Sequence, residues 1–577
     1  MDGASGKRWV EPGGGPECEV AAARLAAALR LHPLAARVLA ARGHSDPEEA
    51  VRFLEAPLQD LPDPFTMKGM NAAVARVARA LEAGERIACY GDYDVDGVTS
   101  TSLLAGFLRA AGGDVVTYVP HRLVEGYGLN REAVVRLAGE GVRLLVTLDC
   151  GITSVEEVRA AAALGVDTVV VDHHTVPVEL PAAAAILNPH QPGCAYPTED
   201  LAAVGVTFAF VMALRRRLRE AGRFGAHRPE PNLKDALDLV ALGTIADVVP
   251  LVGANRTLVR WGLEALAKSR RPGVRALKRI AGIADGQPVT AGQVGFRLAP
   301  RINAAGRLDD AARGVRLLLA TEDEPARTLA EELDRENQAR QEIERRILEE
   351  ATEDAAARVA AGARGLVLAR EGWHPGVVGI VASRIVERFH RPAVLVALEN
   401  ETGKGSGRSI ESFHLHDALS ACAAHLGRFG GHKHAAGVTL ERAALGGFRA
   451  AFEAHAAAQL SDADLQPRCR IDGWVEDGDL TDRAATDLEK LAPFGAGHPE
   501  PVFALRRAAA RGRTVGAAGA HLKLALGARG LDAIGFGMGD RAALCAEGPV
   551  DAAFSVGFDE WDGTRRLQLK LRDVRRS

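Results

Sequence analysis

Short apolar runs alternate with longer amphipathic stretches between residues 86 and 171. The apolar runs predict strands at 87–90, 115–119, 143–148 and 168–171. The stretches between them carry apolar residues at helical spacing and predict helices at 98–111, 130–140 and 153–164. This alternation is typical of an α/β fold with a doubly wound parallel sheet. Ligands of such sheets bind beyond the carboxyl ends of the strands, so the residues that follow each strand are candidates for function.

Three carboxylates, Asp92, Asp94 and Asp96, follow the first of these strands in the sequence GDYDVDG. Like charges that converge in a partly dry site raise one another's pKa unless a cation neutralises them, so this spacing predicts a divalent metal. A calcium-binding EF-hand loop begins with the same spacing, but its twelfth position would be Leu103 instead of a bidentate glutamate. The predicted strand before the loop also differs from the helix of an EF-hand, which excludes that class. A solvated acidic turn is the remaining alternative, and it does not explain why the acids stand between a buried strand and an apolar helix.

Further metal-ligating residues follow the other strands. Asp149 comes after the third predicted strand, His173 and His174 come after the fourth, and Asp247 stands at the end of a later apolar helix. Oxygen-rich sites with an imidazole suit Mn²⁺ or Mg²⁺ better than structural zinc, which prefers thiolates. Asp149 can bridge two ions about 3.5–4 Å apart, an arrangement used for in-line attack on phosphorus. The sequence therefore predicts phosphoester hydrolysis with two metal ions.

The segments DYDVDG, LDCG and VDHH, together with the later Asp247, resemble successive motifs of the DHH phosphoesterase family. The resemblance extends from about residue 20 to the C-terminus. It implies a catalytic set of Asp149, His173 and His174, in which His174 lies beside the scissile phosphate as a hydrogen-bond donor or leaving-group acid. The metal ligands that it implies are Asp92, Asp94, Asp96, Asp149, His173 and Asp247.

Candidate phosphate-binding residues lie in three other segments. Two glycine-rich stretches, 403–409 (GKGSGRS) and 430–437 (GGHKHAAG), predict loops whose backbone N–H groups can form an anion nest, with His434 among their cationic residues. Neither fits the Walker pattern, which argues against a nucleoside triphosphate site. The segment RINAAGR at 301–307 resembles a further motif of the same family. The nucleic-acid contacts that the resemblance implies are Arg122, Arg301, Asn303, Arg307, Ser406, Arg408 and Ser409.

The chain of 577 residues is too long for a single hydrophobic core. A polar-faced pattern over about 322–361 predicts one long helix that connects two domains. A second α/β unit follows, and short β-prone segments after about residue 465 predict a small barrel, for which an OB-fold is the natural candidate in a nucleic-acid-binding protein. The predicted sections are an N-terminal helical preface at 1–85, a DHH catalytic domain at 86–320, a connector helix at 321–362, a DHH-associated substrate-binding domain at 363–462 and the OB-fold domain at 463–577.

Composition and charge limit the class of protein. Hydrophobic residues make up 47% and charged residues 25% of the chain, which is typical of a folded globular protein. The net charge of −4 argues against a uniformly basic coat, so a polyanion would be bound by local clusters such as Arg215–Arg219. Seven cysteines without a CxxC pair indicate a reducing compartment, and the N-terminal residues have no apolar signal core. We expect a cytoplasmic monomer that does not associate with membranes.

These observations predict phosphoester hydrolysis, and the resemblance implies a 5′ to 3′ exonuclease that degrades single-stranded DNA to 5′-mononucleotides in repair and recombination. The expected cofactors are two Mn²⁺ or Mg²⁺ ions, and the expected partners are single-stranded DNA, a single-strand-binding protein and a helicase. One alternative is a phosphodiesterase of the same family that acts on pyrophosphate, short oligonucleotides or cyclic dinucleotides. Such enzymes usually lack the helical preface and the barrel. The other alternative is a non-catalytic single-strand-binding scaffold, which we would expect to have lost some of the acids retained here.

Overall fold

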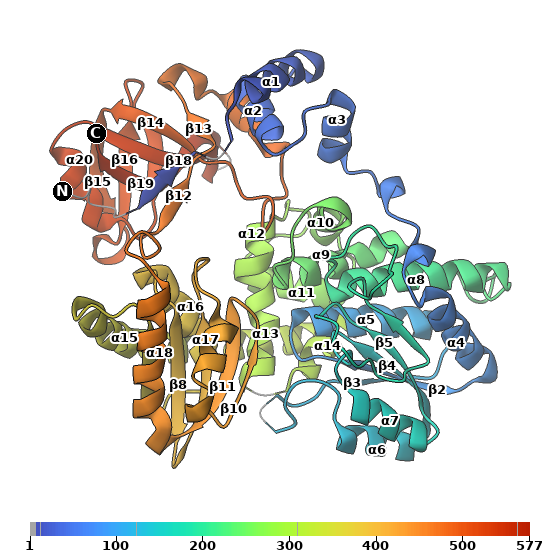
Figure 1. Cartoon of the computed structure of the whole chain (residues 1–577). Helices are drawn as coiled ribbons and strands as arrows, with labels where there is room; N and C mark the ends of the chain where they lie inside the picture. Colours follow the sequence, from blue (N-terminus) through green and yellow to red (C-terminus); the bar gives the residue numbers. More distant parts are fainter. Residues whose placement is uncertain (1–6, 12, 123, 309, 562–563) are drawn as a thin grey trace. The chain divides into compact units, whose positions relative to one another are not determined.

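The computed structural model describes residues 7–11, 13–122, 124–308, 310–561 and 564–577 (Figure 1). The chain forms two compact units. Unit 1 comprises the residues up to Glu55, then 342–492 and 500–577, and unit 2 comprises 56–341 and 493–499. Helix α15 (Asp323–Ala360) contains the boundary between residues 341 and 342, so the predicted long connecting helix is present.

Unit 2 contains a five-stranded parallel sheet in the order β3-β2-β4-β5-β6. The four predicted strands are confirmed, and β6 is a short additional edge strand that was not predicted. The bounds of these strands are β2 Arg86–Gly91, β3 Val115–Tyr118, β4 Val142–Leu148, β5 Asp167–Val171 and β6 Ala185–Leu187.

Helices cover both faces of this sheet, as the doubly wound prediction requires (Figure 1). In β2, Ile87 and Cys89 join a core formed with α4 (Met70–Ala83), α5 (Val95–Ala110) and α8 (Ala203–Glu220). The alternate residues Ala88 and Tyr90 pack on the other face against α6 (Arg131–Gly139) and α7 (Val155–Ala163). Because both faces of the strand are buried, the strand reads in the sequence as a continuous apolar run.

Five further helices of unit 2 pack around this region. They are α9 (Leu237–Ala246), α10 (Gly253–Ala267), α11 (Pro272–Ile280), α13 (Ala299–Leu308) and α14 (Ala312–Leu319). Helix α9 packs against α5 and α10, which places its C-terminal end near the acidic turn that begins α5. Among the described residues, no helix has the length and apolar character that a membrane span requires.

The second α/β region belongs to unit 1 and contains a five-stranded mixed sheet in the order β10-β11-β9-β8-β7. Its helices are α16 (Val378–Phe389), α17 (Leu415–Ala421) and α18 (Leu445–Gln459). Its strands are β7 Leu366–Glu371, β8 Ala393–Glu399, β9 Thr402–Arg408, β10 Arg428–Gly431 and β11 Ala435–Glu441.

The prediction that the two glycine-rich stretches are loops was wrong except for residues 432–434, which connect β10 to β11. Most of the first stretch forms β9, a central strand, and the second contributes to the β10–β11 hairpin. The alternate glycines Gly403, Gly405 and Gly407 pack closely against neighbouring side chains, because an added Cβ would lie 2.7–2.9 Å from Val396, Val438 and Leu415. These glycines therefore permit close packing within the domain instead of opening the backbone to an anion.

The C-terminal region of unit 1 is a seven-stranded sheet in the order β13-β14-β18-β19-β17-β16-β15. The N-terminal strand β1 (Arg8–Val10) pairs in parallel with β12 (Arg468–Arg470), so the two ends of the chain share this region. The strands of the large sheet are β13 Gly473–Trp474, β14 Phe503–Ala508, β15 Ala510–Val515, β16 His521–Leu526, β17 Leu531–Gly535, β18 Val550–Trp561 and β19 Thr564–Arg576.

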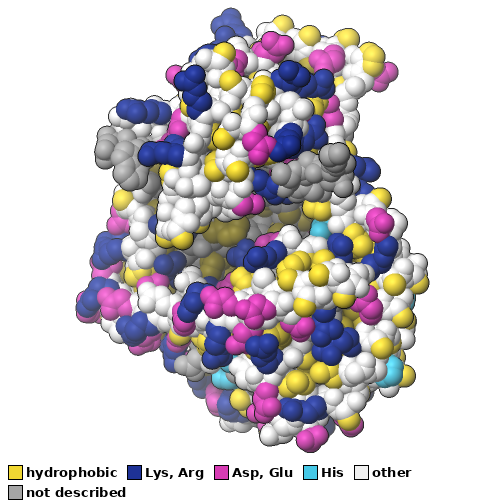
Figure 2. Space-filling view, turned by 90° about the vertical axis from the view of Figure 1, so that its left-hand side faces the viewer, with side chains coloured by type: hydrophobic (Ala, Val, Ile, Leu, Met, Phe, Trp, Pro, Cys, Tyr) yellow, Lys and Arg dark blue, Asp and Glu magenta, His cyan; other side chains and the backbone are white. Residues whose placement is uncertain are grey.

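Three N-terminal helices also belong to unit 1: α1 (Pro16–Leu29), α2 (Pro33–Ala41) and α3 (Pro47–Glu55). The backbone N–H of His32, at the start of α2, donates a hydrogen bond of 2.7 Å to Asp487 in α19 (Asp482–Glu489). The helical preface is thus divided, since α4 lies in unit 2. Basic and acidic side chains are intermixed over the face shown in Figure 2, as expected from the small net charge.

Candidate metal centre and active site

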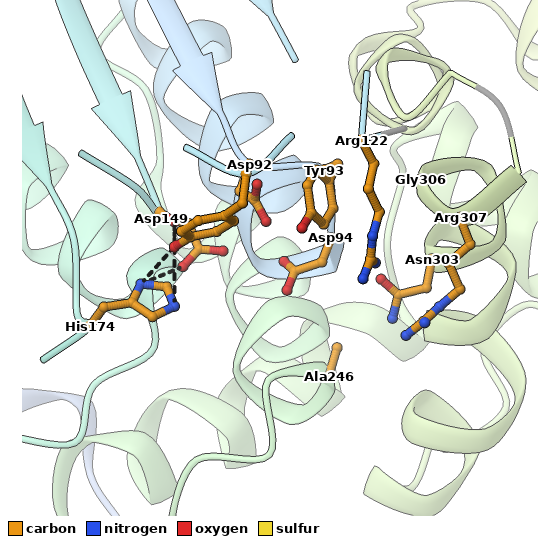
Figure 3. Close-up of a pocket in the computed structure, with 11 residues that line it drawn as sticks. Asp92, Tyr93, Asp94, Arg122, Asp149, His174, Ala246, Asn303, Gly306 and Arg307 are labelled. Carbon is orange, nitrogen blue, oxygen red and sulfur yellow. Dashed lines mark hydrogen bonds and ion pairs between the residues drawn. The ribbon is translucent and has the colours of Figure 1, made fainter. Parts of the chain in front are cut away.

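The candidate site lies at the carboxyl edge of the parallel sheet in unit 2. Strands β2 and β4 are neighbours, while β3 lies on the other side of β2, so the connections from β2 and β4 leave the sheet at the point where the strand order reverses. Ligands of doubly wound sheets bind at such a switch point. A pocket of about 290 Å³ lies here, lined in part by Asp92, Asp94, Asp149 and His174 (Figure 3).

Helix N-termini orient two of the three carboxylates after β2. The Oδ1 atom of Asp94 accepts hydrogen bonds from the backbone N–H groups of Asp96 and Gly97, so Asp94 caps helix α5. The carboxylate of Asp96 accepts the N–H groups of Ala203 and Val204 at 2.6 and 2.8 Å, at the start of α8. The positive ends of two helix dipoles thereby favour negative charge at these positions.

The backbone around β4 holds Asp149 in an uncommon conformation. Asp149 has φ of +64°, in the left-handed region that residues other than glycine seldom adopt. Its N–H donates to the carbonyl of Val171 at 2.9 Å, which fixes it beside the end of β5. Only 2% of Asp149 is exposed. Strain of this kind often occurs at functional sites, where the surrounding structure maintains it.

His173 lies among three of the predicted metal ligands. Its Nε2 atom is 3.3 Å from Oδ1 of Asp149, 3.6 Å from Oδ2 of Asp247 and 3.9 Å from Oδ2 of Asp96. Asp247 directly follows the last residue of α9, as the sequence predicted. Residues from three strand ends and one helix end are therefore brought to a single point.

The arrangement of donor atoms fits divalent metal ions. Three groups have donor atoms within 4.8 Å of one another: Asp92 with Asp94 and Asp149, Asp96 with His173 and Asp247, and Asp149 with His173 and His174. Three buried donor atoms, Oδ1 of Asp92, Oδ1 of Asp149 and Nε2 of His173, have no hydrogen-bond partner among the described residues. Buried polar atoms without partners are rare and costly, and metal ions bound by these groups would satisfy all three atoms.

The pKa values of the acids show the need for positive charge. Burial, followed by repulsion from Asp94, raises the pKa of Asp92 and of Asp149 well above the usual value. Burial and neighbouring acids likewise raise the pKa of Asp96 to about 7 and that of Asp247 to about 9. Burial lowers the pKa of His173 to about 4, which leaves a neutral imidazole that can bind a metal.

His174 has the opposite character from His173. Burial alone would lower its pKa, but the hydrogen bond with Asp172 and the negative charges of Asp172, Asp247 and Asp94 together outweigh burial and raise the pKa of His174 to about 9. Asp172 is fully buried and also accepts the backbone N–H groups of Ile152 and His174. These hydrogen bonds keep the pKa of Asp172 below its usual value despite burial. The pair therefore holds a protonated imidazole at the edge of the metal site.

Two functional candidates were missed from the sequence, Asp172 and Tyr127. Asp172 stands in the VDHH segment, where its carboxylate could have been recognised as a partner for the adjacent histidines. Tyr127 follows β3, and its hydroxyl lies 3.3 Å from the carbonyl oxygen of Asp149 and 3.3 Å from Nδ1 of His174. No pattern in the segment RLVEGYG distinguishes this tyrosine from an ordinary loop aromatic.

Basic and amide side chains line the opposite side of the pocket. In Figure 3, Arg122, Asn303 and Arg307 point toward one another across from Asp92 and His174. The guanidinium of Arg122 lies over the ring of Tyr93 at 4.7 Å, and Oδ1 of Asn303 accepts the N–H of Val95 at 3.2 Å. These contacts hold the side chains beside the acidic turn.

Arg301 lies outside this lining. Its Nε donates to Asp334 of α15 at 2.8 Å, and Nη1 donates to the carbonyl of Arg297. Its guanidinium therefore connects α13 to the first part of α15.

The remaining predicted contacts lie together in unit 1. Ser406 and Arg408 are on β9, where Nη1 of Arg408 donates to Oγ of Ser406 at 3.1 Å. The N–H of Ser409 donates to the carbonyl of His434 at 3.1 Å, and its hydroxyl donates to Phe413. The four predicted residues thus form one cluster at the end of β9.

Three sequence families match consecutive parts of the chain. Residues 86–244 match the family described as "DHH family, N-terminal domain", residues 362–458 match the "DHHA1 domain", and residues 471–573 match the "RecJ OB domain". The α/β sheet with the acidic site, the second α/β region and the C-terminal sheet correspond to these matches. The expected fold class is thereby confirmed.

The chain is similar to named nucleases over nearly its whole length. It is 41% identical over 559 residues to the single-stranded-DNA-specific exonuclease RecJ of Dickeya dadantii, covering 94% of this chain and 96% of that protein. It also resembles the crystal structure of Thermus thermophilus RecJ in complex with Mn²⁺, with a TM-score of 0.85 and 34% identity, covering all of this chain and 80% of that one. The Mg²⁺ complex of the Thermus protein gives a TM-score of 0.78 and 32% identity, covering 99% of this chain and 78% of that one.

Proposed function

The chain belongs to the RecJ family of single-stranded-DNA-specific exonucleases, and from this premise we propose that it hydrolyses single-stranded DNA at the carboxyl edge of the unit 2 sheet. The observation that carries the proposal is the set of buried donor atoms on Asp92, Asp149 and His173 for which the described part of the chain provides no hydrogen-bond partner. Such atoms are expected where a divalent metal completes the site. The DHH domain makes the protein a hydrolase of the phosphoesterase class.

Two metal ions would be held by two neighbouring groups of donors, and Asp149 and His173 lie between these groups because they also form a third group with His174. The donor groups are Asp92, Asp94 and Asp149 on one side and Asp96, His173 and Asp247 on the other. When bound, Mn²⁺ or Mg²⁺ would supply positive charge to the phosphate and acidify an attacking water. RecJ from Thermus thermophilus is known in complex with each of these ions.

The protonated His174 acts on the substrate in this proposal. Its Nδ1 is bound by Asp172, at 2.7 Å, and Nε2, which lies 3.4 Å from the Tyr127 hydroxyl, would be the donor to the substrate. From that position it would donate a hydrogen bond to a phosphate oxygen and supply a proton to the leaving oxygen. The Tyr127 hydroxyl lies within reach of the same ring and of the Asp149 carbonyl, and it would restrict the orientation of both.

Arg122, Asn303 and Arg307 would bind the phosphate of the terminal nucleotide, since they line the same pocket as the acids. Arginine suits this role because its planar fork matches two phosphate oxygens. In unit 1, the cluster of Ser406, Arg408, Ser409 and His434 would bind another part of the strand. The OB domain at 471–573 would bind single-stranded nucleic acid through stacking and backbone contacts.

The proposal also covers the direction of cleavage, the product, the protein partners and the location in the cell. We expect 5′ to 3′ polarity and release of 5′-mononucleotides, in DNA repair and recombination. A single-strand-binding protein and a helicase would be partners, and the protein would act as a cytoplasmic monomer.

The proposal is tested with single-stranded DNA labelled separately at each end and incubated with Mn²⁺, Mg²⁺ or chelator. Immediate metal-dependent release of the 5′ label as a mononucleotide, abolished in Asp149→Ala, is expected. The exposed Asp60 of the same unit provides a matched control, because Asp60→Ala should leave the rate unchanged. Cleavage of dinucleotides or pyrophosphate with intact long strands would support the metal site but contradict the substrate assignment.

A further inference from the structure

The turn at residues 493–499 (PFGAGHP) belongs to unit 2, although the residues on either side of it, Ala492 and Glu500, belong to unit 1. The chain therefore leaves the C-terminal region, contacts the catalytic unit and returns. Within the turn, the N–H of Gly495 donates to the carbonyl of His498 at 2.9 Å, and the reverse hydrogen bond measures 3.2 Å. The His498 ring stacks on Phe494 with centroids 5.5 Å apart, and only 2% of His498 is exposed. This is an ordered turn.

The turn contacts the segment that directly follows the candidate metal ligand Asp247. The N–H of Leu251 donates a hydrogen bond of 2.8 Å to the carbonyl of Ala496. The buried guanidinium of Arg256, in α10, points toward the same turn and donates to the carbonyl of Pro493 at 3.4 Å. These contacts lie between the end of α9 and the first turns of α10.

Two glycines allow this close approach. An added Cβ on Gly495 would lie 2.7 Å from Cδ1 of Leu251, at the flexible end of that side chain. An added Cβ on Gly497 would lie 2.9 Å from Cβ of Pro250, which belongs to a rigid ring. Gly497 also has φ of +69°, a backbone conformation that favours glycine. The turn thus fits against Pro250 and Leu251 without room for larger residues.

The segment between α9 and α10 needs such support. Asp247 is the C-cap of α9, and Val248 has φ of +64° although it is β-branched. After Val248 the chain passes through Pro250, whose carbonyl is bonded by the Asn255 side chain at 3.0 Å. The hydrogen bond from Leu251 to Ala496 then fixes the end of the segment. A shift of this segment would move the Asp247 carboxylate, which lies 3.6 Å from Nε2 of His173.

We propose that the turn at 493–499 is a positioning element for the metal ligand Asp247, so that a segment encoded within the C-terminal region sets the metal affinity of the catalytic unit. The inference rests on the proposed role of Asp247 in metal binding. Residues that orient metal ligands typically contribute about 10-fold to 100-fold to metal affinity. Loss of the turn's fit should therefore weaken metal binding while leaving the metal-saturated enzyme active.

The test uses Gly497→Ala in the full-length protein. Gly286→Ala is the matched control, because Gly286 also has positive φ (+77°) in unit 2 and an added Cβ there meets nothing within 4 Å. Gly495→Ala gives a graded comparison, since its clash falls on a flexible side chain. Mn²⁺ binding is measured by isothermal titration calorimetry, and nuclease activity is measured against Mn²⁺ concentration, with thermal unfolding recorded for each variant.

We expect the Mn²⁺ dissociation constant to rise about 10-fold in Gly497→Ala, less in Gly495→Ala and not in the control, with kcat recovered at saturating Mn²⁺. An unchanged Mn²⁺ affinity in Gly497→Ala would overturn the inference, as would a loss of activity that excess Mn²⁺ does not restore. Asp247→Asn distinguishes failure of the role proposed for the turn from failure of the assignment of Asp247 as a metal ligand. If that variant binds Mn²⁺ as the parent does, the ligand assignment under the proposed function fails instead.

Discussion

The Nδ1 atom of His174 lies 2.7 Å from Oδ1 of Asp172, and this contact makes the two adjacent histidines chemically different. The Nε2 atom of His173 has no hydrogen-bond partner among the described residues, and the pKa of His173 falls to about 4 on burial. His174 keeps its proton because Asp172 remains ionised within a set of backbone N–H donors. One imidazole is thus suited to bind metal and the other to donate a proton.

Asp172→Asn should remove this difference. Without the carboxylate, the largest contribution that opposes burial is lost, so the pKa of His174 should fall from about 9 and a smaller fraction of the imidazole should be protonated at neutral pH. We expect kcat at neutral pH to fall about 10-fold to 100-fold. The alkaline limb of the pH–rate profile should also move to lower pH. A uniform loss of activity with an unchanged profile would contradict the role assigned to the pair.

Metal removal should make stability depend on pH. The pKa values of Asp96 and Asp247 are about 7 and about 9, which is above the ordinary value of 3.8. Between pH 3.8 and these raised values, the metal-free folded state therefore binds more protons than the unfolded chain. Stability of the metal-free protein therefore decreases as pH rises through this window. Bound metal favours the ionised carboxylates, so Mn²⁺ should stabilise the protein more at about pH 8 than at about pH 5.

Thermal unfolding with chelator or Mn²⁺ at both pH values measures this effect. At a metal concentration 100 times the dissociation constant, a single site contributes about 2.7 kcal/mol. Asp247→Asn should reduce both the pH slope and the gain from Mn²⁺. If Mn²⁺ raised the stability equally at both pH values, Asp96 and Asp247 would not lose protons when metal binds, and the prediction would be wrong.

The sheet and its acidic edge were predictable because their signals are local. Strand β2 is apolar on both faces, and the acids stand where it ends, so Asp92 and Asp94 could be placed without tertiary information. In contrast, β9 carries alternate glycines, which have low strand propensity and stand there because Val396 and Val438 pack against them. That reason is visible only after the chain has folded.

The individual roles of arginines were also beyond the sequence. Arg301 and Arg307 stand in one motif, RINAAGR, but only Arg307 lines the pocket, whereas Arg301 pairs with Asp334 on a later helix. The contact of Leu251 with Ala496 joins residues far apart in the chain, and no spacing rule predicts it. Pairings of this kind depend on how separately predicted elements pack.

Tyr127→Phe should reduce kcat by about threefold to 10-fold and leave KM for DNA nearly unchanged. The hydroxyl contacts the Asp149 carbonyl and the His174 ring, and burial raises the pKa of Tyr127, so the phenol is protonated and can donate a hydrogen bond. Tyr196→Phe, in the core of the same unit, is the control. A change in KM alone would indicate that Tyr127 contacts the DNA and does not orient the catalytic residues.

Arg301→Ala and Arg307→Ala should have opposite signatures. Arg301 is partly buried and pairs with Asp334 at 2.8 Å, so its removal leaves a partly buried carboxylate without its partner. We expect a loss of about 1–3 kcal/mol in the free energy of unfolding, measured in urea, with little change in DNA affinity. Arg307 lines the pocket, and its removal should weaken DNA binding about 10-fold because a charge-assisted contact with phosphate is lost.

The salt dependence of binding distinguishes these causes. Each phosphate contact on a single strand contributes about −0.7 to the slope of the logarithm of the association constant against the logarithm of salt concentration. Arg307→Ala should reduce the magnitude of the slope by about that amount, whereas Arg301→Ala should leave it unchanged because Asp334, and not phosphate, is its partner. If Arg301→Ala lowers the slope at unchanged stability, then its ion pair opens when DNA binds and the family motif contributes both arginines to the strand.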